Sequence, residues 1–208
     1  MLIENIKPKD IEKRSFEIIE GELRENGISL EPEYAHIIKR CIHTSADFDY
    51  AESLYFTDGV VDIIGNAIKS GCNILTDTKM AQAGINKTKL DEFGTATMCF
   101  IGAEDVAVQA KERGLTRSYV AMERALLLEK PVVFVIGNAP TALFSILKMA
   151  EEKKIKPVAV VGVPVGFVNV IESKELLMSS GIPCIVNKGR KGGSNIAASI
   201  VNAIQYNL

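Results

Sequence analysis

His43 is the best candidate for proton transfer in this chain, because it is one of only two histidines among 208 residues. Histidine is the common side chain that changes charge near neutral pH, so it can both donate and accept a proton in a reaction. The stretch around it, Ile42-His43-Thr44-Ser45-Ala46-Asp47, adds hydroxyl and carboxyl groups. A single histidine near a helix end is more often structural than catalytic, so residue type alone indicates the role without establishing it.

Arg40 and His36 precede His43 by three and seven residues on one expected helix. Residues three or four positions apart share a helix face, so Arg40 is placed to anchor an anionic substrate against His43. Seven residues rise about 10 Å along a helix, so His36 and His43 do not reach one metal ion. We therefore expect an anion anchor and no metal site, with an ordinary surface position as the alternative for Arg40.

Residues 189–195, Gly-Arg-Lys-Gly-Gly-Ser-Asn, combine flexible glycines, two cations and the start of the last expected helix. Backbone amides at the start of a helix attract anions, so this loop, with Arg190, is predicted to hold a carboxylate or a phosphate. It lacks the spacing of a Walker phosphate loop. A strand-to-helix turn with solvated charges is the alternative.

Residues 137–141 follow an apolar stretch, and Pro140 suits the first turn of a helix, so the backbone near Asn138 is expected to face a ligand. Residues 162–166, Gly-Val-Pro-Val-Gly, lack the Gly-x-Gly-x-x-Gly order of a dinucleotide loop. This absence argues against nicotinamide binding.

Arg117, in Leu115-Thr116-Arg117-Ser118, precedes another expected helix and offers a second cation to a ligand. The alternative is a purely local role for this segment, in which Thr116 or Ser118 caps the helix.

Short apolar strands alternate with amphipathic helices along most of the chain, which indicates a mostly parallel sheet covered on both faces. We predict an α/β fold, three-layer α/β/α with a mostly parallel central sheet, as a single domain over residues 1–208. Helices are expected over 8–25, 32–44, 60–69, 105–113, 119–129, 141–153, 172–179 and 195–206, and strands over 73–76, 97–101, 132–136, 158–161 and 184–186. Ligands of such sheets bind beyond the carboxyl ends of the strands, so the loops at 77–80, 137–141, 162–166 and 189–195 are expected at one edge.

Composition excludes several classes of function. A formal net charge of -2 argues against nucleic acid or an anionic membrane as the main partner. The N-terminus lacks the pattern of a signal peptide, and no apolar run reaches the length of a membrane span, so a cytoplasmic location is expected. The four cysteines, Cys41, Cys72, Cys99 and Cys184, are widely spaced, which predicts reduced, mostly buried thiols with no disulfide and no zinc site.

Several segments together resemble one known family, the precorrin-8X methylmutases, also called cobalt-precorrin-8 methylmutases, and the likeness runs in order over essentially the whole chain. The segments are Ile42-His43-Thr44, Gly137-Asn138-Ala139-Pro140-Thr141-Ala142-Leu143, Gly162-Val163-Pro164-Val165-Gly166-Phe167-Val168, Glu172-Ser173-Lys174 and Gly189-Arg190-Lys191-Gly192-Gly193-Ser194.

This resemblance implies a cytoplasmic homodimer of α/β/α fold, with an active site near the dimer interface that binds a corrinoid precursor rich in acetate and propionate groups. The family moves a methyl group from carbon 11 to carbon 12 of the macrocycle. His43 matches the catalytic histidine, a proton donor and acceptor, and Ser15 and Arg40 match positions that contact substrate. No cofactor is expected, since any cobalt arrives inside the substrate. The expected substrate-binding residues are Ser15, Arg40, Thr44, Arg117, Asn138 and Arg190.

Two other readings compete with an isomerase. A corrinoid-binding carrier without chemistry would use the same anion-binding loops but leaves His43 unexplained. A nucleotide-dependent enzyme of Rossmann type is disfavoured because the glycine fingerprint is missing.

Overall fold

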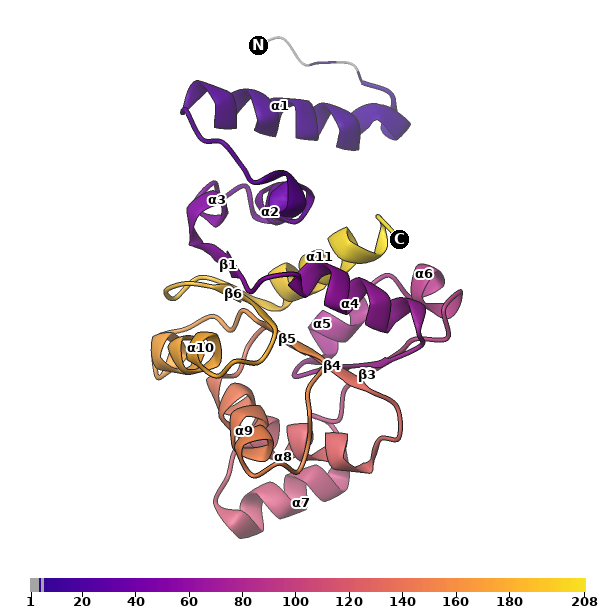
Figure 1. Cartoon of the computed structure of the whole chain (residues 1–208), viewed down its shortest axis with the longest axis vertical. Coiled ribbons are helices and arrows are strands. Elements are labelled where there is room, and N and C mark those ends of the chain that lie inside the picture. The colour runs from indigo at the N-terminus through magenta and orange to yellow at the C-terminus, as the bar shows by residue number, and fades with distance from the viewer. Residues whose placement is uncertain (1–3, 5) are drawn as a thin grey trace.

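The computed structural model of the chain describes residue 4 and residues 6–208. In this part of the chain six strands form one sheet, in the order β1-β6-β5-β4-β2-β3 (Figure 1). The strands are β1 (Leu54–Phe56), β2 (Asn73–Thr76), β3 (Ala96–Met98), β4 (Val132–Ile136), β5 (Ala159–Gly162) and β6 (Cys184–Asn187).

Helices cover both faces of the sheet, so the fold has three layers (Figure 1). On one face α11 lies with α4 and α5, and α2 packs on α11; on the other face α9 and α10 lie against the sheet, with α8 packed on α9 and α7 on α8. The helices are α1 (Ile11–Glu25), α2 (Pro32–Ser45), α3 (Tyr50–Ser53), α4 (Val60–Lys69), α5 (Lys79–Gly84), α6 (Lys87–Asp91), α7 (Glu104–Arg113), α8 (Arg117–Glu123), α9 (Pro140–Glu151), α10 (Val170–Ser179) and α11 (Ser194–Gln205), with 3-10 turns at Pro8–Asp10 and Arg124–Leu127.

The central strand β4 shows why the sheet is buried on both sides. All five of its residues are buried and apolar. Successive side chains of a strand point to opposite faces, so Val133 and Val135 enter the core beneath α11, and Phe134 and Ile136 enter the core beneath α9. A strand that must be apolar on both faces loses the period-2 pattern and reads as a continuous apolar run.

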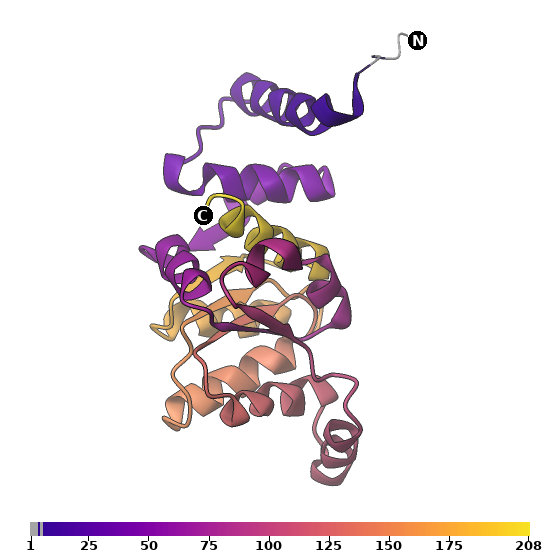
Figure 2. The same cartoon turned by 90° about the vertical axis from the view of Figure 1, so that its right-hand side faces the viewer.

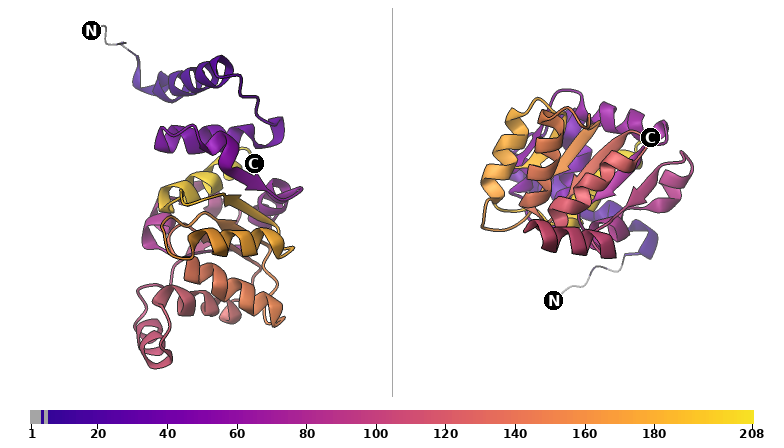
Figure 3. Two further views of the ribbon diagram at one scale, coloured as in Figure 1. Left: turned by 90° about the vertical axis from the view of Figure 1, so that its left-hand side faces the viewer. Right: turned by 90° about the horizontal axis from the view of Figure 1, so that it is seen from below.

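The N-terminal helices form an arm outside this sandwich. Figure 2 shows α2 stacked on the sandwich and α1 outermost, and Figure 3 shows α1 and α7 at opposite ends of the molecule. One face of α2, formed by Ile37, Ile38, Cys41 and Ile42, is buried. On α1 the buried residues are Ile19 and Leu23. The amphipathic pattern of each helix therefore sets which side of α1 faces α2 and which side of α2 faces α11.

The predicted fold class is confirmed, and most expected elements lie within a few residues of the observed ones. Two expectations were wrong in detail. The helix expected over 119–129 ends at Glu123 and continues as a 3-10 turn, and the strand expected over 97–101 ends at Met98. The strand β1, which pairs antiparallel with β6, was not predicted, and neither were α3, α5 and α6. Elements of three to six residues are too short to show a period.

Among the described residues no helix is long and apolar enough to cross a lipid bilayer. The four cysteines are free thiols, and Cys41, Cys72 and Cys184 are buried as expected, whereas Cys99 is half-buried. Burial raises the pKa of Cys41 to about 12, which keeps this thiol protonated and unreactive at neutral pH.

Candidate active site

His43 lies on the last turn of α2 and is held by two residues of α1. The Ser15 hydroxyl oxygen lies 2.8 Å from Nδ1 of His43. The Phe16 ring stacks on the imidazole, with 5.3 Å between ring centroids and 27° between planes. The helix ends directly afterwards because Ala46 adopts a left-handed conformation and donates its N–H to Ile42 O over 2.7 Å. The imidazole is therefore fixed in orientation at the end of a helix.

The second ring nitrogen of His43, Nε2, is not engaged by Ser15. His43 is exposed to solvent, and Nε2 has no hydrogen-bond partner among the residues that the structure describes. Because Nδ1 is bonded to Ser15, Nε2 is the nitrogen that can exchange a proton with a bound molecule. The arrangement suits a general acid or base.

Arg40 lies beside His43, as expected from their spacing, but its guanidinium already has partners. It forms an ion pair with Glu12 of α1 and lies 4.9 Å from the centroid of the Phe16 ring and 5.5 Å from that of Tyr206. His43 and Arg40 thus touch the same phenylalanine. A substrate carboxylate would have to displace Glu12 to reach Arg40.

Thr44 follows His43 and is exposed, with its hydroxyl donating to Arg40 O over 2.8 Å. The hydroxyl proton is thus already donated to Arg40 O, but the oxygen can still accept a hydrogen bond from a ligand.

His36 is separate from this cluster. Its Nε2 is buried without a hydrogen-bond partner in the described part of the chain, and burial lowers the pKa of His36. No group of three side chains suited to holding a metal ion occurs among residue 4 and residues 6–208. His43 is therefore the histidine available for chemistry at the surface.

The loop around Asn138 is held by a buried carboxylate of the same chain. Asp77, fully buried at the end of β2, accepts the backbone N–H groups of Gly137, Asn138 and Ala139 at 2.9, 2.8 and 2.7 Å. Burial raises the pKa of Asp77, while the three N–H donors act in the opposite direction. The three amides of this loop are therefore already bonded to the chain's own carboxylate, so a ligand would not find them free. Only the exposed side chain of Asn138 remains for a substrate.

The expected gathering of loops at the carboxyl edge of the sheet is confirmed by direct contacts. Asp77 holds the loop that follows β4, and Thr78 Oγ1 lies 2.8 Å from Ser194 Oγ at the start of α11. Gly193 donates its N–H to Val163 O over 2.9 Å. At Gly137 a Cβ atom would lie 2.6 Å from the Cα of Ser194, so only glycine fits this approach.

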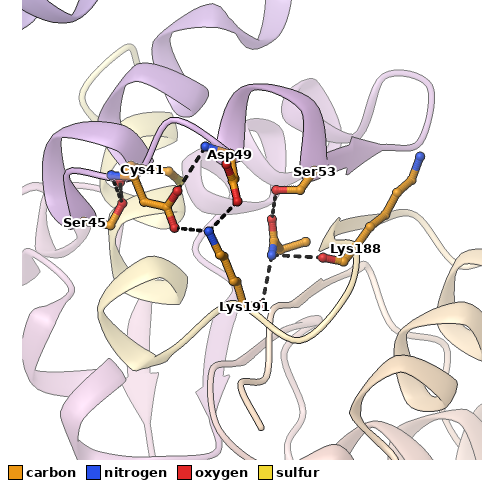
Figure 4. Close-up of polar contacts among 8 residues, drawn as sticks. Cys41, Ser45, Asp49, Ser53, Lys188 and Lys191 are labelled. Atoms are coloured by element: carbon orange, nitrogen blue, oxygen red, sulfur yellow. Dashed lines mark hydrogen bonds and ion pairs between the residues drawn. The ribbon is translucent and has the colours of Figure 1, made fainter. Parts of the chain in front are cut away.

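The two cations of residues 189–193, called here the glycine loop, have different surroundings. Arg190 is exposed and forms no ion pair with the described residues; its guanidinium lies 5.6 Å from the centroid of the Phe167 ring. Lys191 instead pairs with Asp47 at 2.6 Å and with Asp49 at 2.5 Å (Figure 4). Arg190 is therefore the cation of this loop that is open to an anionic ligand.

Sequence reasoning missed an apolar surface beside Arg190. Phe167 is 84% exposed and Val168 is 77% exposed, in the loop between β5 and α10. Gly166 donates its N–H to Arg190 O over 3.2 Å, which ties this loop to the glycine loop. The available signal was the apolar run that continues past the end of β5, where a loop would ordinarily be polar.

Arg117 is not brought to His43 within one chain. It begins α8, which lies on the opposite face of the sheet from α2 (Figure 1). Thr116 caps α8 by accepting the Tyr119 N–H at 3.2 Å, and donates to Thr141 Oγ1 over 2.7 Å. The local capping role considered for this segment is thus present.

Comparisons with known proteins agree on one family. A family model described as precorrin-8X methylmutase matches residues 10–207. The cobalt-precorrin-8 methylmutase of Salmonella typhimurium is 45% identical to this chain, with 97% of this chain and 96% of the relative covered. The precorrin-8X methylmutase of Pseudomonas aeruginosa is 38% identical, with 93% of each chain covered. The solved structure of a precorrin-8x methyl mutase from Thermus thermophilus superposes with a TM-score of 0.84 at 33% identity, covering 95% of this chain and 96% of that one.

Proposed function

We propose the reaction of this chain from one premise: it belongs to the precorrin-8X methylmutase family and is an isomerase of cobalamin biosynthesis. Its substrate is cobalt-precorrin-8 or the cobalt-free precorrin-8X, the two compounds in the names of its relatives. The reaction moves a methyl group from carbon 11 to carbon 12 of the macrocycle and gives cobyrinate or hydrogenobyrinate. The observation that carries the proposal is an exposed imidazole fixed by Ser15 and Phe16.

His43 acts as proton donor and acceptor. The proposed proton transfer uses the tautomer in which Nδ1–H donates to the Ser15 hydroxyl, 2.8 Å away, so that the mobile proton is carried on Nε2. Nε2 gives this proton to the conjugated ring system and receives one back after the methyl group has moved. The isomerisation therefore consumes no proton and no co-reactant. A correctly placed acid or base of this kind contributes about 10²–10⁴-fold to a rate.

The acetate and propionate groups of the substrate are held by cations and polar side chains at the same edge. Arg190 has no competing carboxylate among the described residues, whereas Arg40 exchanges Glu12 for a substrate carboxylate. Charged hydrogen bonds of this type give both affinity and orientation. Ser15, Thr44 and Asn138 are further proposed contacts, and the apolar surface of Phe167 and Val168 lies against the macrocycle.

The protein is proposed to be a cytoplasmic homodimer with its site near the interface. Support comes from α1, the outermost helix, which carries Ser15 and also exposes the apolar side chains Ile11 and Ile18. A second copy would cover them. Arg117, on the far face of its own chain, is proposed as a substrate contact contributed by the other copy. No resident cofactor takes part, and cobalt enters only as part of the substrate.

The test is conversion of the cobalt-containing and cobalt-free precursors, followed by the visible spectrum and by identification of the product. The wild-type protein is expected to form the rearranged corrin, and His43→Ala is expected to bind the precursor without converting it. His36→Asn, which changes the other histidine, serves as the control and should turn over normally. Near-normal turnover by His43→Ala would contradict the proposal. Binding without conversion by the wild-type protein would favour a carrier.

A further inference from the structure

We propose that Lys191 is a positioning residue of the reaction, which fixes the turn that follows His43 against the glycine loop that presents Arg190. The proposal rests on the proposed function of His43 as the proton donor. It assigns the two adjacent cations of the loop different tasks, one toward the substrate and one toward the protein.

The side chain of Lys191 bridges two carboxylates that follow His43 in the chain. Its ammonium group lies 2.6 Å from Asp47 and 2.5 Å from Asp49, which are 144 and 142 residues away in sequence. Hydrogen bonding to these carboxylates raises the pKa of Lys191, and hydrogen bonding to Lys191 lowers the pKa of Asp47. Both directions favour the charged forms of Lys191 and Asp47. Lys191, Asp47 and Asp49 are called here the clamp.

A continuous series of hydrogen bonds connects the clamp to the helix that carries His43 (Figure 4). The Asp49 N–H donates to Asp47 Oδ1 over 3.0 Å, and the Asp47 N–H donates to Ser45 Oγ over 3.2 Å. The Ser45 hydroxyl in turn donates to Cys41 O over 2.8 Å, in the turn of α2 that includes His43. A displacement of Asp47 is thus transmitted to the end of α2.

Two buried side chains, Lys174 and Asn187, hold the main chain of Lys191 in place. Lys174, only 1% exposed, donates to Gly189 O and to Lys191 O, both over 2.8 Å. The buried side chain of Asn187 donates to Lys191 O over 2.9 Å. Asn187 also accepts the Ser53 hydroxyl over 2.6 Å, which adds a link to α3. The backbone of Lys191 is therefore held by several hydrogen bonds, so its side chain can fix the positions of Asp47 and Asp49.

The surroundings of Lys191 make it a poor anchor for substrate. Two carboxylates already neutralise its charge, and they would repel an incoming acetate or propionate. Arg190, one residue earlier, has no ion pair among the described residues. The clamp is also too exposed to contribute much to stability, since the Lys191 side chain is 49% exposed. Its contribution is geometric, because a small misplacement of a reacting group can lower a rate as much as ~10²-fold.

The kinetic test compares Lys191→Met with Lys191→Arg, with Arg190→Met and with Lys156→Met, a control at an exposed lysine outside the site. We expect Lys191→Met to lower kcat at least about tenfold, because His43 is no longer held in position. Product affinity should stay within about threefold of wild type, because Arg190 and Arg40 remain to bind the carboxylates. Lys191→Arg should recover most of kcat, and Arg190→Met should mainly weaken affinity. The proposal is overturned if Lys191→Met keeps kcat within about twofold of wild type. It is also overturned if Lys191→Met mainly weakens product affinity, as expected for Arg190→Met.

A second measurement needs no substrate and so separates this proposal from the proposed function. The chain has two histidines, so the imidazole NMR signals of His43 and His36 can be assigned with His36→Asn. We expect the His43 signal to move in Lys191→Met and to return in Lys191→Arg, while the His36 signal stays in place. An unchanged His43 signal in folded Lys191→Met would show that the clamp does not position the imidazole. Absence of conversion by the wild-type protein would instead refute the proposed function alone.

Discussion

The hydroxyl of Ser15 on α1 lies 2.8 Å from Nδ1 of His43 on α2, across 28 residues of sequence. This contact joins the outermost helix of the molecule to the proposed proton donor (Figure 2). It restrains the orientation of the imidazole, and Nε2 has no hydrogen-bond partner among the described residues. Phe16, the next residue, stacks on the same ring and restricts its rotation.

Ser15→Ala is expected to lower kcat roughly tenfold, less than His43→Ala, because the imidazole loses its orienting partner but keeps its acid and base function. Steady-state turnover of the precursor, with kcat and KM separated, measures the effect. Thermal unfolding should be nearly unchanged, because the contact is partly exposed to solvent. Turnover equal to wild type would show that Ser15 does not orient the ring.

Glu12→Gln is expected to increase the affinity for the corrin product about threefold at low salt, because the ion pair that competes for Arg40 is removed. Glu20→Gln is the matched control, since Glu20 pairs with the neighbouring Lys39 at 2.5 Å. Titration of each variant with the coloured product gives the affinities. Equal affinities for wild type and Glu12→Gln would argue against Arg40 as a substrate anchor.

Phe167→Ser is expected to weaken product binding by about ten- to a hundredfold, because a large apolar side chain that covers the macrocycle contributes about 1.5–3 kcal/mol. Leu127→Ser changes another exposed apolar residue, 71% exposed on the 3-10 turn after α8, and should leave affinity unchanged. Sedimentation of both variants shows whether the oligomeric state is preserved. A drop in mass with unchanged affinity would assign Phe167 to contact between two copies.

Lys174→Met is expected to alter how stability depends on pH. Burial lowers the pKa of Lys174 from 10.5 to about 8, so between these values the folded protein binds fewer protons at this site than the unfolded chain. The contribution of Lys174 to the free energy of unfolding therefore rises as the pH increases from about 8 to about 10.5. In Lys174→Met this rise is absent, so the advantage of wild type over the variant should widen across the window.

Denaturant unfolding of wild type and Lys174→Met at several pH values from 7 to about 10.5 checks this expectation. The variant should also be less stable by about 1–3 kcal/mol, because two loop carbonyls lose their donor. A constant difference in unfolding free energy across the range would show that Lys174 titrates normally. Lys156→Met, at an exposed lysine, should give a curve parallel to wild type.

The elements with a clear local pattern were predictable. The run Val132–Ile136 is entirely apolar and forms the central strand, and Pro32 starts the helix that ends beside His43. The loop edge was also predictable, because parallel strands bring their carboxyl ends together. The short strand β1 was not, since three residues with mixed burial carry too little periodicity and its pairing depends on β6.

The sequence by itself determined the α/β layering, the position of His43 at a helix end and the family, because helix and strand periods and motif order are properties of neighbouring residues. Only the tertiary structure decided the partners of each polar group. In the folded chain Ser15 contacts His43, Glu12 pairs with Arg40, and Asp47 and Asp49 pair with Lys191. The tertiary structure also used Asp77 to occupy amides that local reasoning had left open to a ligand. Such pairings depend on how elements pack across the fold. The spacing of residues within one segment does not determine the distance between side chains of different elements.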